Sequence, residues 1–259
     1  MNFFFGIKTN DLNCDITIPR FQNHGKVDLE NIVFQAKINL NKWTIQKAQY
    51  KENKNFFFIN NNYIDNEIIF FLAKEKEILK YKKTDYQNIL DLNKFTDTQP
   101  AFRANLKIFN KFGGFSSYQS EYPYSMIEKQ GNILSPLSSL GNNAASENKL
   151  FIRNIYVKPI KKKFDIYFLD IKKKKILFKK EILTNTTNEI KIEKKYINPD
   201  IFLYTNHYIG IPLFVSLKDH HISFEHTHPP HEYIISEDKF KTVAQLKREI
   251  HDIINKKNW

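Results

Sequence analysis

Short stretches in which apolar and polar residues alternate follow one another along most of the chain, and this pattern constrains the fold more than any other feature. Residues 101–109 are the clearest case, because Phe102, Ala104, Leu106 and Ile108 alternate with polar residues. In an extended chain, such alternation places the apolar side chains on one face and the polar ones on the other. The segment is therefore predicted to be a half-buried strand.

Further stretches rich in β-branched and aromatic residues have the length of strands and lie close together, without helical patterns between them. They cover residues 15–18, 31–38, 43–48, 55–59, 67–73, 150–157, 164–169, 176–182, 188–193, 201–205, 211–217 and 222–228. Many short strands at close spacing are typical of an all-β protein. We expect an antiparallel β-sandwich or barrel-like sheets.

One helix is expected, at the C-terminal end of the sequence. Apolar residues recur there at helical spacing, and Ser236 is suited to cap the first turn. These apolar residues are Phe240, Val243, Leu246, Ile250 and Ile253. We predict that this helix packs on a face or an edge of a sheet.

The predicted organisation has three parts. Residues 1–97 form an N-terminal β-rich region, 98–235 a β-sandwich region, and 236–259 the helix. A segment rich in Gly, Ser and Asn at 128–149 is either a linker or a long loop within one domain. A single domain over 1–259 is the alternative.

The chain carries a net charge of +12, and only four of its 40 basic residues are arginine. The excess of Lys, Asn, Ile, Phe and Tyr also fits AT-rich coding. Specific nucleic-acid readers depend on arginine forks, so we do not expect nucleic acid to be the partner. The lysine runs at 161–163 and 172–175 are predicted to be solvated hairpin turns.

Cysteine content and hydropathy indicate the compartment. Cys14 is the single cysteine, which leaves no disulfide within the chain. The longest apolar runs, such as 68–73, are far shorter than the roughly 20 residues of a membrane span. The first residues lack the pattern of a signal peptide. We expect a cytoplasmic protein without a transmembrane segment.

Five of the eight histidines lie between positions 220 and 231. Residues 211–217 and 222–228 can pair as a hairpin around 218–221. If Leu217 faces Ile222, then Leu213 faces His226 and residue 211 faces His228. His226 and His228 would then share an otherwise apolar face, while His220 and His221 would lie at the turn and face solvent.

Two imidazoles on one side of a strand can present nitrogen atoms to a single metal ion. The predicted metal ligands are His226, His228 and His231, with His207 as a further candidate. Zinc, iron and manganese all accept imidazole ligands. In this version Glu232, Glu225 or His231 would handle protons. A metal-free histidine that binds an anion or acts as a base is one alternative, and purely structural histidines are another.

The spacing His226-x-His228-x-x-x-Glu232, with Pro229 inside it and three apolar residues at 233–235, is similar to the first metal motif of cupins. The resemblance covers about a dozen residues. The glycines that flank this motif in cupins are absent here, and the part of the chain that follows contains only His251 in place of the second motif. What the resemblance implies is metal chemistry on a β-scaffold.

A second segment, residues 112–125, combines glycines, serines and tyrosines. Tyr118, Gln119 and Tyr122 could stack on and hydrogen-bond a sugar, or the segment could be a turn packed on the core. Among the few arginines, Arg103 and Arg153 could bind an acidic ligand. A structural ion pair, partly buried at Arg153, is the alternative.

The leading expectation is an enzyme or ligand-binding protein with a His-rich polar site, in one version a metal-dependent enzyme acting on a small polar or carbohydrate-like substrate. A non-catalytic β-sandwich that binds a carbohydrate or a partner through residues 118–124 is the alternative. Lysine-driven nucleic-acid binding is the third possibility.

Overall fold

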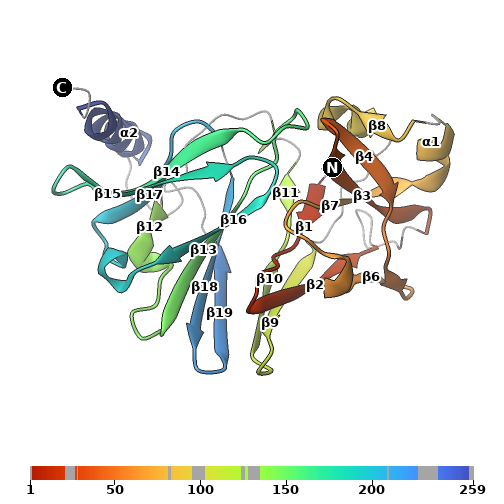
Figure 1. Ribbon diagram of the computed structural model, residues 1–259, viewed down its shortest axis with the longest axis horizontal. Helices are drawn as coiled ribbons and strands as arrows, with labels where there is room; N and C mark the ends of the chain where they lie inside the picture. The colour runs from red at the N-terminus through yellow and green to blue at the C-terminus, as the bar shows by residue number, and fades with distance from the viewer. Residues whose placement is uncertain are drawn as a thin grey trace.

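The computed structural model consists mainly of antiparallel strands in four sheets, which confirms the all-β prediction (Figure 1). The structure describes residues 2–20, 27, 29–80, 83–94, 103–123, 126–127, 135–208, 210–226 and 239–256. The sheets pack in pairs around hydrophobic cores, so the fold is a pair of joined β-sandwiches.

The first sandwich joins a six-stranded and a five-stranded sheet. The six-stranded sheet has the order β11 (Tyr122–Pro123), β1 (Asn2–Phe5), β7 (Ile69–Lys74), β3 (Asn31–Asn39), β4 (Lys42–Lys47), β8 (Asp85–Tyr86). The five-stranded sheet has the order β10 (Phe115–Gln119), β9 (Asn105–Asn110), β2 (Leu12–Pro19), β6 (Phe56–Ile59), β5 (Lys51–Glu52). One continuous core encloses apolar side chains of both sheets.

Strand β2 illustrates why these residues form a half-buried sheet. Leu12, Cys14 and Ile16 are fully buried in the core, whereas Asp15 and Thr17 are partly exposed on the other face. Burying the apolar face stabilises the strand, and the polar face stays in contact with water. The outer face of the five-stranded sheet is therefore polar.

The second sandwich joins two four-stranded sheets. One has the order β12 (Ser135–Pro136), β17 (Ile201–Thr205), β14 (Lys163–Asp170), β15 (Lys175–Leu183). The other has the order β16 (Thr187–Ile192), β13 (Glu147–Arg153), β18 (Ile211–Lys218), β19 (His221–His226). Most predicted strands match these elements within two or three residues at each end.

The two central strands of the β16–β13–β18–β19 sheet, β13 and β18, are buried on both faces. Leu150, Ile152 and Phe214 belong to the core of the second sandwich. Their neighbours along the strands, Phe151 and Leu213 among them, belong to the core of the first sandwich. This sheet is therefore the shared layer that holds the two sandwiches together.

Helix α2 (Lys239–Asn255) confirms the predicted C-terminal helix. Its Ile250 and Ile253 are buried against Tyr167 and Leu169 of β14, on the outer side of that sheet. The predicted cap, Ser236, lies outside the described residues. No helix in the described part of the chain is long and apolar enough to span a membrane.

Several shorter helical segments lie between the strands. They are α1 (Glu75–Lys80), η2 (Asn61–Tyr63), η3 (Ile89–Lys94), η5 (Leu137–Ser139) and η6 (Lys194–Tyr196). Segments of three to six residues are too short to display the periodicity on which a helix prediction depends.

Pairing between strands crosses the predicted boundary at residue 97. Strand β9 pairs with β2, and β11 pairs with β1, so β9, β10 and β11 complete the first sandwich. Alternation identifies a strand but not its partner, which is why the sequence did not reveal this pairing. The division into regions 1–97, 98–235 and 236–259 and its alternative, a single domain, stay predictions from the sequence.

The two lysine runs differ in their positions. Residues 171–174 form the turn between β14 and β15, with Asp170 paired to Lys175, as expected for a solvated hairpin turn. Lys161 and Lys162 instead lie in the connection that precedes β14. Only the second run is therefore a hairpin turn.

Candidate functional site

The histidine-rich hairpin has the register expected from its sequence. In the β18–β19 ladder Leu213 pairs with His226, residue 215 with 224, and Leu217 with Ile222. Asp219, with a φ of 54°, lies in the tight turn, and His220 and His221 are exposed beside it. His226 therefore lies on the face that meets the first sandwich.

His226 is half-buried and packs against Tyr118 of β10. The centroids of the two rings are 4.4 Å apart, and the planes are inclined by 46°. Phe224 meets the same tyrosine edge-on at 6.1 Å. The structure thus brings together two of the predicted site residues, Tyr118 and His226, while Glu225 lies exposed on the opposite face of β19.

The remaining predicted metal and catalytic residues, His228, His231 and Glu232, lie outside the described residues. Across the positions that the structure describes, no three His, Cys, Asp or Glu side chains are grouped so as to hold a metal ion. His207 is exposed next to Tyr208. The metal site therefore stays a prediction from the sequence.

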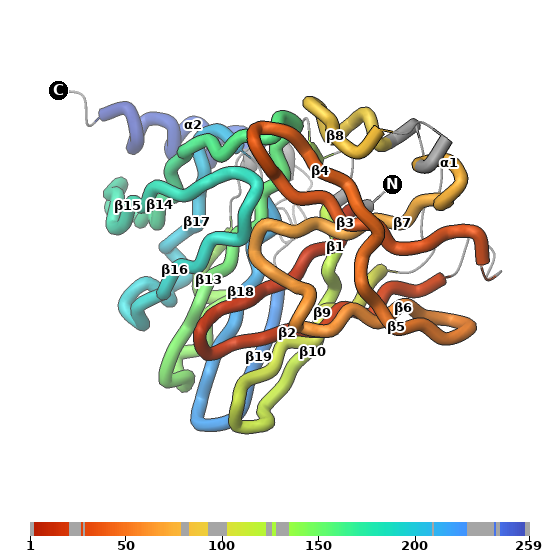
Figure 2. The backbone as a smooth tube through the Cα atoms, turned by 45° about the vertical axis from the view of Figure 1, so that its right-hand side comes forward, coloured from red at the N-terminus to blue at the C-terminus, as the bar shows by residue number. Residues whose placement is uncertain are grey.

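Two hairpins lie side by side, β9–β10 and β18–β19, and they also meet at their tips (Figure 2). The Nδ2 of Asn110 donates to the His220 carbonyl, and the Phe112 ring lies 5.2 Å from the His220 ring. A Cβ on Gly114 would lie 1.5 Å from the His220 oxygen, so only glycine fits there. The tip of the histidine hairpin is thereby fixed to the first sandwich.

Arg103 and Gln119 meet on the outer face of the five-stranded sheet. The guanidinium donates to the Gln119 side-chain oxygen, and its Nε lies 3.0 Å from the Glu121 carboxylate. Burial raises the pKa of Glu121, and the positive charge of Arg103 opposes that shift. Arg103 is exposed, so this part of the predicted site is open to a ligand.

Two other predicted ligand residues are enclosed by protein. Tyr122 and Arg153 are both fully buried, and a ligand could reach neither unless the structure opened. Burial raises the pKa of the Tyr122 phenol above its usual range, with a hydrogen bond to the backbone of Ile155 opposing this.

Arg153 meets backbone carbonyls where the sequence suggested a carboxylate. Its Nη1 donates to the carbonyl of Asn66, and its Nη2 donates to that of Glu67 at 3.2 Å. Burial lowers the pKa of Arg153 to about 10, against the opposing charges of Asp65 and of Glu67. Arg153 thus ties β13 of the second sandwich to the loop that precedes β7 of the first.

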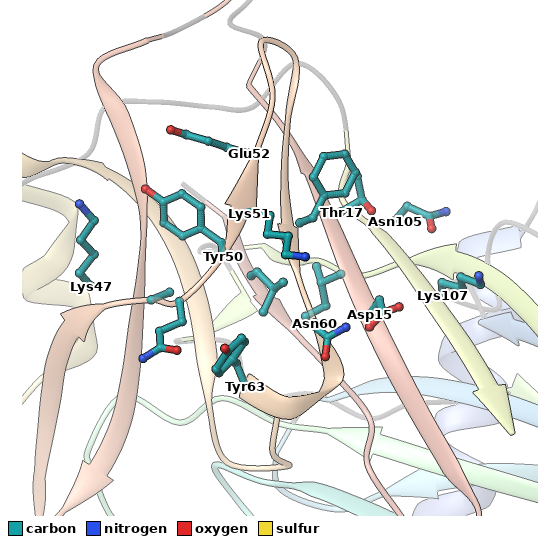
Figure 3. A pocket seen from close by; sticks show the side chains of 15 residues that line it. Asp15, Thr17, Lys47, Tyr50, Lys51, Glu52, Asn60, Tyr63, Asn105 and Lys107 are labelled. Atoms are coloured by element: carbon teal, nitrogen blue, oxygen red, sulfur yellow. The ribbon is translucent and has the colours of Figure 1, made fainter. Parts of the chain in front are cut away.

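A pocket that the sequence did not indicate lies on the outer face of the five-stranded sheet (Figure 3). It encloses about 690 Å³ and lies where the chain crosses from β4 of one sheet to β5 of the other. Its lining consists of Asp15, Ile16, Thr17, Lys47, Ala48, Gln49, Tyr50, Lys51, Glu52, Phe58, Ile59, Asn60, Tyr63, Asn105 and Lys107.

Strand register sets the floor of this pocket. Asp15 of β2 is the cross-strand partner of Lys107 on β9, and Thr17 is the partner of Asn105. The Asp15 carboxylate accepts a hydrogen bond of 3.0 Å from the backbone N–H of Asn61, and the Lys107 ammonium lies 4.7 Å from the centre of the Phe115 ring. These neighbours orient both charges in place.

Two aromatic rings of the pocket are accessible, since Tyr63 is 44% exposed and Phe58 is 38% exposed. In the view of Figure 3, Asn60 lies between Tyr63 and Asp15 of β2. The ring of Tyr50 packs edge-on against Phe57, with 5.0 Å between the ring centroids. Burial, together with the charge of Glu52, raises the pKa of the Tyr50 phenol.

Some of the charges around the pocket are already paired. Glu52 lies 2.9 Å from Arg20, and Lys47 lies 3.5 Å from Glu75. Glu52 and Asp15 are the two carboxylates in the lining, and among the described residues only Glu52 has an arginine partner there, Arg20. Amides, hydroxyl groups and rings dominate the rest, which suits binding of a polar ligand.

Sequence reasoning missed this pocket because its walls come from five strands, the connection between β4 and β5, and the segment around η2. Alternation at 15–18 and 101–109 does predict polar outward positions there. Only the register between β2, β6 and β9 brings these positions together.

Comparison of the chain with protein-family models, with curated proteins and with solved structures gave no match.

Proposed function

We propose that this protein is a non-catalytic binding protein that takes a polar, carbohydrate-like ligand in the pocket on the outer face of its five-stranded sheet. The observation that supports this most is the combination of accessible rings with amide and hydroxyl groups around one open cavity of about 690 Å³.

Sugars have apolar faces and polar edges, and this pocket offers partners for both. The rings of Tyr63 and Phe58 supply flat apolar surface. Gln49, Asn60 and Asn105 carry amides, which donate and accept hydrogen bonds at the same time. An array of hydroxyl groups can therefore be matched without a net charge on the ligand.

The test is calorimetric titration of the full chain with neutral and uronic-acid oligosaccharides. Tyr63→Ala should weaken binding about tenfold, because a stacking surface is lost. Phe112→Ala is the matched control, since Phe112 is 61% exposed at the distant β9–β10 turn and should leave binding unchanged. Failure of every saccharide to bind, or unchanged binding by Tyr63→Ala, would overturn the proposal.

Three other expectations stay predictions. They are a metal-dependent enzyme at His226, His228 and His231 with Glu225 or Glu232 moving protons, a cytoplasmic location, and lysine-driven binding of nucleic acid. The first has its own test in the Discussion.

A further inference from the structure

We infer that the ligand of this pocket is a linear oligosaccharide whose chain leaves the pocket and continues across the sheet to Gln119 and Arg103. This inference rests on the proposed function and specifies the ligand further, from a carbohydrate-like molecule to an oligomer that spans the sheet.

One row of cross-strand partners crosses all five strands of the sheet. Lys51 pairs with Phe58, and Phe58 pairs with Thr17. Thr17 pairs with Asn105, and Asn105 pairs with Gln119 on the edge strand β10. We call it the outer-face row, and it consists of Lys51, Phe58, Thr17, Asn105 and Gln119. Side chains of cross-strand partners share a face, so all five side chains lie on the outer side.

The length of the row exceeds that of the pocket. Four inter-strand steps of about 4.8 Å give a span of about 19 Å, several times the width of a single sugar ring. The first four positions line the pocket, and Gln119 lies one strand beyond it. A monosaccharide would therefore fill only one end of the row.

Gln119 and Arg103 supply hydrogen-bond donors at the far end. Arg103 uses Nη1 for Gln119 and Nε for Glu121, which leaves other guanidinium N–H groups facing solvent. Within the part of the chain that the structure describes, the Gln119 amide nitrogen has no hydrogen-bond partner, so it is available to a hydroxyl group.

The chemistry of the row favours a carbohydrate over a peptide or a polyanion. An extended peptide binds by pairing its backbone with a sheet edge, whereas this row offers only side chains on a sheet face. The row contains one charged residue, Lys51, next to neutral amide, hydroxyl and aromatic groups. The three cations beside the row have acidic neighbours: Lys47 pairs with Glu75, Arg103 with Glu121, and Lys107 is the cross-strand partner of Asp15. A polyanion would need more cations than this.

The test measures how affinity depends on chain length. Cello-oligosaccharides and chito-oligosaccharides of one to six residues are titrated against the full chain. We expect affinity to rise at least about tenfold from two residues to four or five and then to level off. Gln119→Ala should remove most of that gain while leaving disaccharide affinity unchanged.

Gln245→Ala is the matched control, because it makes the same truncation on the exposed side of α2. It should leave the length dependence intact. Thermal unfolding of each variant verifies that it is folded.

Two failures are distinguishable. Equal affinity for short and long chains, or equal weakening of both by Gln119→Ala, overturns the extended row and leaves the pocket standing. Absence of binding at every length overturns the proposed function and the extension with it.

Discussion

The ring of Tyr118 covers one side of the His226 imidazole, with 4.4 Å between the ring centroids. Tyr118 belongs to the first sandwich and His226 to the second, so this contact lies at the junction of the two. An imidazole packed in this way has its ring plane fixed, which orients its nitrogens before any ligand arrives. The orientation would suit a metal ligand and a structural side chain equally.

Metal content separates these two roles. If His226 and His228 hold a metal ion, purified wild-type protein should contain about one zinc, iron or manganese ion per chain. The double variant His226→Ala/His228→Ala should lose it, as measured by inductively coupled plasma mass spectrometry. The control is His220→Ala/His221→Ala, which changes only exposed turn residues. Equally little metal in all three proteins would sink the prediction.

Gly114→Ala should destabilise the protein, because the new methyl group would meet the His220 carbonyl oxygen. Forcing the two hairpin tips apart should cost roughly 1–3 kcal/mol of the free energy of unfolding. Gly113 is an informative comparison, since it has open space but a φ of 90° that favours glycine. Denaturation in urea measures both variants, and wild-type stability for Gly114→Ala would refute the contact.

Arg153→Met keeps the length of the side chain and removes its donors. The carbonyls of Asn66 and Glu67 would lose charge-assisted hydrogen bonds inside the protein. We expect a loss of about 2–4 kcal/mol of the free energy of unfolding. Arg103→Met, at an exposed ion pair, should cost less than about 1 kcal/mol. Similar losses for the two variants would contradict the role assigned to Arg153.

Lys149 links both sandwiches through ion pairs of 2.6 Å to Asp11 and 2.9 Å to Glu189. Burial alone would raise the pKa of Asp11, but the hydrogen bond from Lys149 lowers it below 3.8. Burial likewise opposes the charge of Lys149, yet its two partners raise its pKa above 10.5.

These shifts define where the ion pairs stabilise the fold. The contribution of Asp11 to the free energy of unfolding is lost as the pH falls from 3.8 through the lowered pKa of its folded state. The contribution of Lys149 is lost as the pH rises from 10.5 through the raised pKa of its folded state. Lys149→Met should therefore lower the free energy of unfolding by roughly 1–2 kcal/mol at pH 7 and by less at either extreme. Urea denaturation across pH measures this, with Lys163→Met at an exposed pair as the control. A loss that does not vary with pH would contradict it.

Much of the fold was predictable because alternation and turn chemistry are local. The tight turn at Asp219 fixed which residues of β18 and β19 face each other, so the register followed from the sequence. Strand β1 was missed because Phe3, Phe4 and Phe5 are all buried, and a strand buried on both faces has no alternation. Strand β10 was interpreted as a loop because glycines and serines precede its tyrosine.

The candidate site was predictable only in part. Residue types did indicate Arg103, Tyr118 and Gln119, of which Arg103 and Gln119 meet on the outer face of the sheet while Tyr118 packs against His226. The pocket depends on pairing between β2 and β9, whose partners are about 90 positions apart in the sequence. No single-sequence pattern encodes which of many similar strands will be neighbours.

The β16–β13–β18–β19 sheet, which both sandwiches share, limits the substitutions that the protein can accept. Along β13 from Asn148 to Arg153 every side chain is buried, whereas β15 presents much of its length to water. A substitution on either face of β13 disturbs the core of one sandwich or the other, so neither face of this strand tolerates substitution. Random variation should therefore accumulate on β15 and be purged from β13, and libraries made over the two strands should differ accordingly in their yield of folded protein.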